Sequence, residues 1–89
     1  MKHVSIKVTG LVQGVYFRAS TKEMADTLNI LGFVRNEPDG GVYIEAEGEG
    51  DNLKRFVEWC GRGPSRAVVQ SCDIREGEIK NYQKFEIRR

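Results

Sequence analysis

Two hydrophobic periodicities alternate along this chain, and their order constrains the fold more than any single residue does. Residues 3–9 alternate apolar and polar side chains as in a half-buried strand, whereas residues 19–31 place apolar side chains at helical spacing. Alternation returns over 33–36 and 42–47, on either side of the turn residues 38–41. The pattern predicts a strand, a helix and a two-stranded hairpin in the first half of the chain.

The second half continues the alternation of elements. From residue 51, apolar side chains at positions i, i+3, i+4 and i+7 predict an amphipathic helix, and these side chains are Leu53, Phe56, Val57 and Cys60. Residues 61–64, with two glycines and a proline, end that helix. Residues 66–75 predict a strand whose imperfect alternation indicates a bulge, and residues 85–87 predict a short last strand.

This β-α-β-β-α-β order predicts one domain over residues 1–89 with an α+β, ferredoxin-like sandwich. The sheet is expected to be mixed and mostly antiparallel, with two helices on one face and a short extra C-terminal strand. The first strand, helix and second strand form a crossover, so the two strands run parallel and end at the same edge. We therefore expect the loop Gln13–Arg18 and the side chain of Asn36 to face one another there.

The charges are balanced and interspersed. Lys and Arg number 14 and Asp and Glu number 13, which argues against broad attraction to nucleic acid or anionic membranes. No apolar run approaches the roughly 20 residues of a transmembrane helix, and the first residues lack a signal peptide's apolar region. A cytoplasmic monomer is expected. Cys60 and Cys72 fit neither a disulfide framework nor a metal site; two free thiols are favoured over a bridge.

Residues 10–18 carry most of the chemical information. Their two glycines join a predicted strand to a predicted helix, and such a turn presents several backbone N–H groups to one point, at the positive end of the helix. Arg18 adds a planar, permanently charged fork that suits the oxygens of a phosphate. The sequence therefore predicts a phosphate-binding loop formed by Gln13, Gly14, Val15, Tyr16, Phe17 and Arg18.

Asn36 is the uncharged polar side chain expected beside this loop. An amide is no general base, but it can accept a hydrogen bond from a water molecule and donate one to a substrate. Such a site suits a substrate whose leaving group departs without protonation, and a mixed carboxylic–phosphoric anhydride meets that condition. Catalysis would then rest on positioning and charge stabilisation. The scheme requires neither a metal nor a cofactor.

These residues resemble a known family. Residues 10–18, GLVQGVYFR, closely resemble the first signature of the acylphosphatases, and residues 32–36, GFVRN, resemble the second. The resemblance covers essentially the whole chain and implies the ferredoxin-like fold together with metal-independent hydrolysis of acyl phosphates to carboxylate and inorganic phosphate. It also implies that Arg18 binds the phosphate, that Asn36 positions the attacking water, and that the amides of Gln13–Arg18 bind phosphate.

Other residues receive structural interpretations. Ser20 and Glu23 form a capping box that predicts a helix start just after Arg18, and Gly32 is predicted to end that helix. His3 is expected at the surface, at the far end of the first strand from the loop. The side chains expected in solvent are Glu45, Glu47, Glu49, Arg88 and Arg89. The side chains expected mainly to pack are Val15, Phe17, Met24, Phe56 and Trp59.

Three alternative functions fit the same order of elements. An RNA-recognition module stacks bases on aromatic side chains of its central strands, but here Tyr43 would lie beside Glu45 and Glu47, which argues against it. A metal chaperone needs a Cys-x-x-Cys pair, which the sequence lacks. A closer alternative is a regulatory or accessory version of the acylphosphatase domain, which would bind a phosphorylated metabolite or protein without turning it over. Larger hydrogenase-maturation enzymes resemble this domain at one end, where it handles carbamoyl phosphate. Turnover of an acyl phosphate would distinguish that alternative from the hydrolase.

Overall fold

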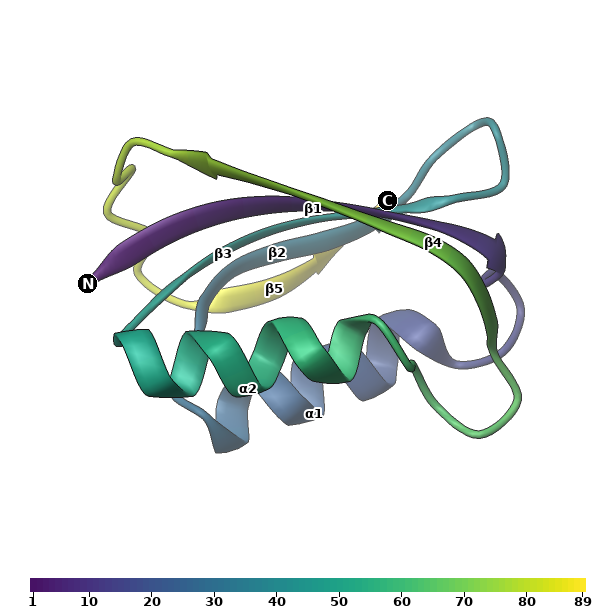
Figure 1. The fold of residues 1–89 in the computed structure, drawn as a ribbon, viewed down its shortest axis with the longest axis horizontal. Helices are drawn as coiled ribbons and strands as arrows, with labels where there is room; N and C mark the ends of the chain where they lie inside the picture. The colour runs from purple at the N-terminus through teal and green to yellow at the C-terminus, as the bar shows by residue number, and fades with distance from the viewer.

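A five-stranded sheet and two helices form two layers in the computed structural model, which describes residues 1–89 (Figure 1). The helices are α1 (Phe17–Thr27) and α2 (Gly50–Cys60), and the strands are β1 (Lys2–Leu11), β2 (Leu31–Asn36), β3 (Val42–Gly48), β4 (Val68–Gly77) and β5 (Phe85–Arg88). Both helices cover the same face of the sheet. Neither is long and apolar enough to cross a membrane.

The strand order is β4-β1-β3-β2-β5. Every neighbouring pair is antiparallel except β2 and β5, which run parallel. Because β1 and β2 each pair antiparallel with β3, they run parallel to each other and end at the same edge of the sheet. The ferredoxin-like arrangement predicted from the order of elements, with its short additional strand, is confirmed.

The bulge predicted from the imperfect alternation lies where β4 pairs with β1. Thr9 is opposite Ser71, but Gly10 is opposite Val69, so that Gln70 is an extra residue on β4. A Cβ atom at Gly10 would lie 2.2 Å from the Val68 carbonyl oxygen, and the φ of Gly10 is +124°. Only glycine therefore allows the two backbones to approach this closely.

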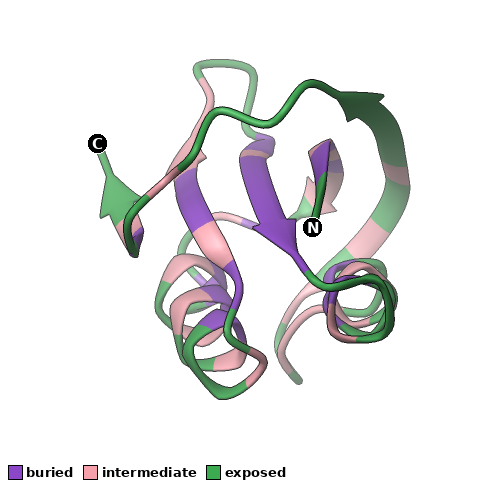
Figure 2. Cartoon of the chain, turned by 90° about the vertical axis from the view of Figure 1, so that its left-hand side faces the viewer, coloured by how far each residue is buried: buried purple, intermediate pink, exposed green.

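The core lies between the sheet and the helices (Figure 2). The second helix packs as its periodicity predicts, with Leu53, Phe56 and Cys60 buried. Met24 and Trp59 are partly buried against the same cluster, as predicted for packing residues. Complete burial of a side chain such as Phe56 contributes about 1.5–3 kcal/mol relative to leaving it exposed, so this face of α2 holds the helix on the sheet.

The first helix differs from its prediction at both ends. It begins at Phe17 and ends at Thr27 instead of spanning 19–31. Ser20 lies inside the helix, where its N–H donates to the Tyr16 carbonyl at 3.0 Å, and no side chain caps the helix. The predicted capping box is therefore wrong: burial of Phe17, which is 2% exposed, fixes the first turn earlier than the polar pattern indicates.

Gly32 does not end this helix. It lies in β2, where its φ is +141° and a Cβ atom would meet the Glu45 carbonyl oxygen at 1.9 Å. Asn29 takes the left-handed conformation after the helix instead, with a φ of 55°. The glycine is therefore required by close approach of β2 to β3, a contact that local sequence does not reveal.

The segment 78–84, which connects the two edge strands β4 and β5, crosses one end of the face of the sheet opposite the helices (Figure 2). Glu47 is completely buried beneath it and accepts hydrogen bonds from the backbone N–H groups of Lys80 and Tyr82. His3 is 4% exposed, and its Nδ1 lies 2.7 Å from Glu47. The expectations of a surface His3 and of solvated Glu45 and Glu47 are therefore wrong.

Candidate active site

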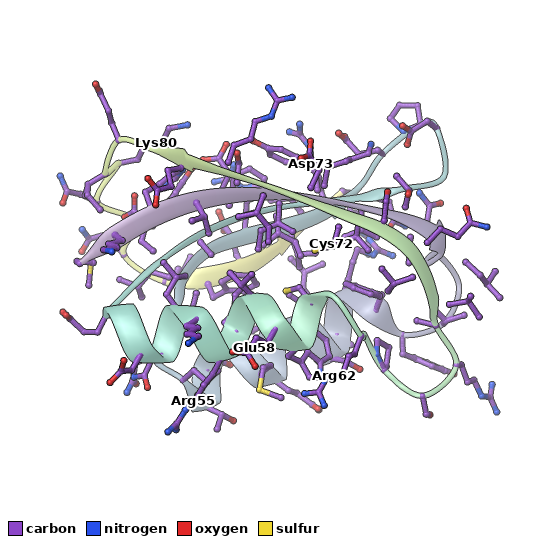
Figure 3. All side chains as sticks on the ribbon, viewed as in Figure 1. Arg55, Glu58, Arg62, Cys72, Asp73 and Lys80 are labelled. Atoms are coloured by element: carbon purple, nitrogen blue, oxygen red, sulfur yellow. The ribbon has the colours of Figure 1, made fainter.

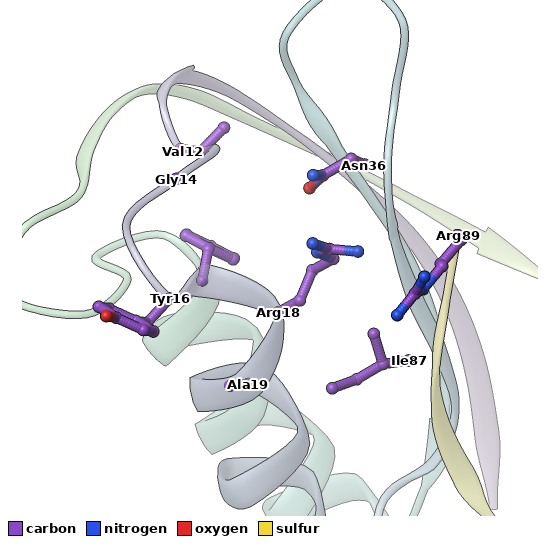
Figure 4. A pocket seen from close by; sticks show the side chains of 9 residues that line it. Val12, Gly14, Tyr16, Arg18, Ala19, Asn36, Ile87 and Arg89 are labelled. Atoms are coloured by element: carbon purple, nitrogen blue, oxygen red, sulfur yellow. The ribbon is translucent and has the colours of Figure 1, made fainter.

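The ends of β1 and β2 open onto a cavity of about 810 Å³ at one edge of the sheet (Figure 4). This volume falls in the range of about 300–1,000 Å³ that is typical of small-molecule sites. The connection from β1 to α1 and the first turn of α1 form one wall, with Val12, Gly14, Tyr16, Phe17, Arg18 and Ala19. Asn36, Ile87 and Arg89 form the rest of the lining. The predicted juxtaposition of the loop and Asn36 is therefore observed.

The loop is held by three side chains buried in the core. Val12 and Val15 are 1% and 8% exposed, and Phe17, which follows them, is 2% exposed. Between them, Gly14 and Tyr16 take positive φ values of 74° and 61°, conformations that are uncommon outside glycine. The Tyr16 ring points into solvent. The anchored side chains thus enforce a sharp turn and leave the loop backbone at the surface of the cavity.

The N–H groups of residues 14–18 have no hydrogen-bond acceptor within the chain. None of them donates to a backbone carbonyl in the turns and caps, and the backbone N–H groups that donate to side chains belong to Gly41, Lys80 and Tyr82. Free donors in a row at a helix N-terminus, where the helix dipole is positive, favour an anion. A backbone with these free donors can bind an oxyanion.

Gln13 and Val15 are not among the residues that line the cavity. The Gln13 side chain instead turns to the β2–β3 connection, where Nε2 donates to the Glu37 and Gly41 carbonyl oxygens at 2.8 and 2.9 Å. These two bonds fix the loop relative to the strand that ends at Asn36. The sequence pattern around Gln13 does not predict these two hydrogen bonds, because both acceptors lie in a turn more than 20 residues further along the chain.

Arg18 and Asn36 point into the cavity from opposite walls (Figure 4). Both side chains are half-buried, and neither makes a hydrogen bond within the protein. Arg18 has no carboxylate within 4 Å, in contrast to Lys22 one turn later, which pairs with Asp26 at 3.0 Å. A free guanidinium and a free amide beside unpaired N–H groups provide the charge and the hydrogen-bonding capacity for a phosphoryl group and one water molecule.

The family model of the acylphosphatases matches residues 4–87. The chain belongs to the acylphosphatase family. It is therefore a hydrolase acting on acid anhydrides, and the function of its family is hydrolysis of acyl phosphates. The acylphosphatase of Marinobacter nauticus is 55% identical over 78 residues, which make up 88% of this chain and 83% of that protein.

Solved acylphosphatase structures share the whole architecture. The crystal structure of acylphosphatase from Bacillus subtilis superimposes with a TM-score of 0.96 at 34% identity, and the match covers 100% of both chains. Full-length HypF in its phosphate- and nucleotide-bound form also matches, with a TM-score of 0.86 at 34% identity. That match covers 97% of this chain but 11% of HypF. The same fold thus occurs both in proteins of this size and as a small part of a larger one.

Two residues that line this cavity, Ile87 and Arg89, were missed by sequence reasoning. Arg88 and Arg89 are both exposed, as expected of a solvated tail, but each also has a defined place in the structure. Arg88 pairs with Glu86 at 2.8 Å and lies over the Phe33 ring at 4.0 Å, whereas Arg89 lines the cavity. The available signal was the alternation after Phe85, a buried residue, which places Ile87 on the same face of β5 as Phe85 and Arg89 directly after the end of that strand.

The reactive groups outside the cavity are occupied or buried. Cys60 and Cys72 are free thiols, the first buried and the second half-buried. Burial raises the pKa of both thiols, which makes them weak nucleophiles at neutral pH. No group of three or more His, Cys, Asp and Glu side chains is arranged to hold a metal ion. His3 is held among the glutamates of β3, at the far end of β1 from the loop.

Proposed function

We propose that this acylphosphatase carries out its hydrolysis in the cavity between the phosphate-binding loop and Asn36, without a metal ion. The observation that carries this assignment is the row of N–H groups at residues 14–18 that have no acceptor in the protein. Together with the unpaired Arg18 guanidinium, they would surround the phosphoryl oxygens of a bound acyl phosphate. Gln13 belongs to this site through its side chain, which holds the loop against the β2–β3 turn.

Asn36 would place the attacking water. Its Oδ1 accepts a hydrogen bond from the water, whose oxygen attacks phosphorus on the side away from the acyl oxygen. A new P–O bond forms as the bond between phosphorus and the acyl oxygen breaks, and the electron pair leaves with the carboxylate. The proton lost by water remains on the phosphate product. A carboxylate is a stable anion at neutral pH, so the leaving group needs no general acid.

Arg18 and the amides supply the rate acceleration by electrostatics. Charge spreads over the equatorial phosphoryl oxygens in the transition state, and donors fixed in advance stabilise that charge without reorganisation. The loop is fixed in advance here because Val12, Val15 and Phe17 are anchored in the core. Inorganic phosphate has the same oxygens as the transferred group, so it would be both a product and a competitive ligand.

The decisive experiment is hydrolysis of benzoyl phosphate by the whole chain in the presence of a chelator. We expect rapid turnover by the wild type and a loss of more than 10³-fold in kcat/KM in Arg18→Ala, because one preorganised donor alone is worth about 10²–10³ and Arg18 also anchors the ligand. The matched control is Arg55→Ala, which removes an exposed arginine of α2 on the far side of the molecule (Figure 3).

Two results would overturn the proposal. Inhibition by the chelator that is reversed by added metal would contradict the mechanism. Absence of wild-type turnover with phosphate binding retained would favour the accessory alternative, in which the loop binds a phosphorylated metabolite or protein.

From the balanced charges and the composition we infer that the protein is a monomer in the cytoplasm. Sedimentation equilibrium of the purified chain would test whether it is a monomer.

A further inference from the structure

Arg89 is a second unpaired cation in the cavity. No carboxylate lies within 4 Å of it, whereas its neighbour Arg88 pairs with Glu86 at 2.8 Å. Strand alternation puts Glu86 and Arg88 on one face of β5 and Ile87 on the other, and Arg89 follows directly after the end of the strand. The cavity therefore holds two guanidinium groups, those of Arg18 and Arg89, and no Asp or Glu side chain among its lining residues.

The two arginines are not equivalent in position. Arg18 lies next to the phosphate-binding loop on α1, whereas Arg89 comes from the opposite wall, beyond the end of β5 (Figure 4). Ile87 lines the same wall with an apolar side chain. When a phosphoryl group occupies the loop, its acyl substituent has to extend away from the amides, into the part of the cavity that Ile87 and Arg89 line.

We propose that Ile87 and Arg89 form an acyl-side subsite that favours acyl phosphates whose acyl group carries a carboxylate. This inference rests on the proposed function, because it takes the loop to hold the phosphate. Ile87 would contact the carbon skeleton of the acyl group, and Arg89 would pair with its carboxylate. A carboxylate on the acyl group would meet the paired donors of a single guanidinium with both of its oxygens, while the row of amides and Arg18 would hold the phosphoryl group.

The test compares two substrates that differ only by this group, benzoyl phosphate and 4-carboxybenzoyl phosphate. We expect Arg89→Gln to lower kcat/KM for the carboxylated substrate about fivefold more than it lowers kcat/KM for benzoyl phosphate, which is the effect of losing one exposed ion pair. Arg89→Lys should retain part of the preference. Arg88→Gln is the matched control, since it removes the neighbouring arginine on the other face of β5.

A binding measurement separates this inference from the proposed function. Calorimetric titration with phenylphosphonate and 4-carboxyphenylphosphonate needs no turnover, and we expect the wild type to bind the second more tightly and Arg89→Gln to lose that preference. If the wild type hydrolyses neither substrate but shows this binding pattern, the proposed function fails and the subsite stands. If Arg89→Gln lowers kcat/KM equally for the two substrates and lowers affinity equally for the two phosphonates, Arg89 acts on the phosphoryl group that all of these ligands have in common. The subsite is then overturned, while the hydrolase stands.

Discussion

Asn36 and Arg18 share one cavity, but the roles proposed for them can be separated by kinetics. Asn36 holds water and not phosphate, so Asn36→Ala should lower kcat by about 10²–10³-fold and leave the inhibition constant of inorganic phosphate nearly unchanged. The side chain makes no hydrogen bond within the protein, which means that its removal leaves no partner unsatisfied. Steady-state hydrolysis of benzoyl phosphate, with phosphate as a competitive inhibitor, measures both quantities.

The matched control for this variant is Asn52→Ala, which removes an asparagine side chain from α2, away from the cavity. It should retain the kcat of the wild type. An equal loss of turnover and of phosphate affinity in Asn36→Ala would contradict the role in water positioning and would place the amide among the phosphate ligands.

Residues of the site differ in how far sequence can predict them. Arg18 and Asn36 were predictable, because each lies in a motif and the crossover rule brings both to one edge of the sheet. The side-chain role of Gln13 was not, since its two acceptors belong to a turn formed later in the chain. Arg89 was interpreted as part of a solvated tail because the parallel pairing of β5 with β2, which carries it to the cavity, depends on the path of the preceding segment.

At the scale of elements, the segment 78–84 and β3 are joined by carboxylates that local patterning assigns to solvent. Glu45 accepts hydrogen bonds from the hydroxyl groups of Tyr43 and Tyr82, at 2.8 and 2.6 Å, and pairs with Lys80 at 3.0 Å. Burial of Glu45 raises its pKa, but the hydrogen bonds from Tyr82, Tyr43 and Lys80 outweigh that effect and lower the pKa to about 2. The ionised carboxylate of Glu45 therefore fastens the segment to the sheet.

This arrangement predicts a loss of stability in acid. A depressed folded-state pKa contributes stability that is present above the unfolded value of about 4.5 and is lost as the pH falls toward 2. The contribution of Glu45 at neutral pH is on the order of 3 kcal/mol. The pKa of Glu47 is also lowered, because hydrogen bonds from Lys80, His3 and Tyr82 outweigh its burial. Urea unfolding at several pH values between 7 and 2 measures the effect.

Glu45→Gln should be less stable than the wild type at pH 7 and should lose less stability on acidification. The control is Glu49→Gln, because Glu49 lies just beyond β3 with its side chain 74% exposed, and it should keep the wild-type dependence on pH. A parallel loss of stability in acid for the wild type and Glu45→Gln would show that the carboxylate does not fasten the segment.

The segment 78–84 and its position over the sheet were not predicted from the sequence, for a reason that lies in the pattern of the elements. Hydrophobic periodicity indicates which face of a strand or helix packs in the core, so it predicts the positions of α2, β1 and β3 correctly. It does not report what covers the other face, and a segment without regular structure carries no period. The connection over the sheet follows only from the strand order, because β4 and β5 occupy opposite edges and residues 78–84 must cross β1, β3 and β2 between them.

For the whole molecule, ligand binding and folding are linked through the loop. The unpaired N–H groups of residues 14–18 converge only when Val12, Val15 and Phe17 are packed in the core, so inorganic phosphate should bind the folded state and not the unfolded chain. At a phosphate concentration 100 times the Kd, binding adds about 2.7 kcal/mol, which raises the Tm of a domain of this size by more than about 10 °C.

Thermal unfolding followed by circular dichroism, in phosphate and in chloride at equal ionic strength, tests this linkage. Chloride controls for general screening, which acts on the surface ion pairs and not on the loop. Arg18→Ala should lose most of the phosphate-dependent rise in Tm while keeping a similar Tm in chloride, since the guanidinium has no partner within the protein. An equal rise in the wild type and Arg18→Ala would place the stabilising phosphate elsewhere, and the loop would then not be the anion site of the folded molecule.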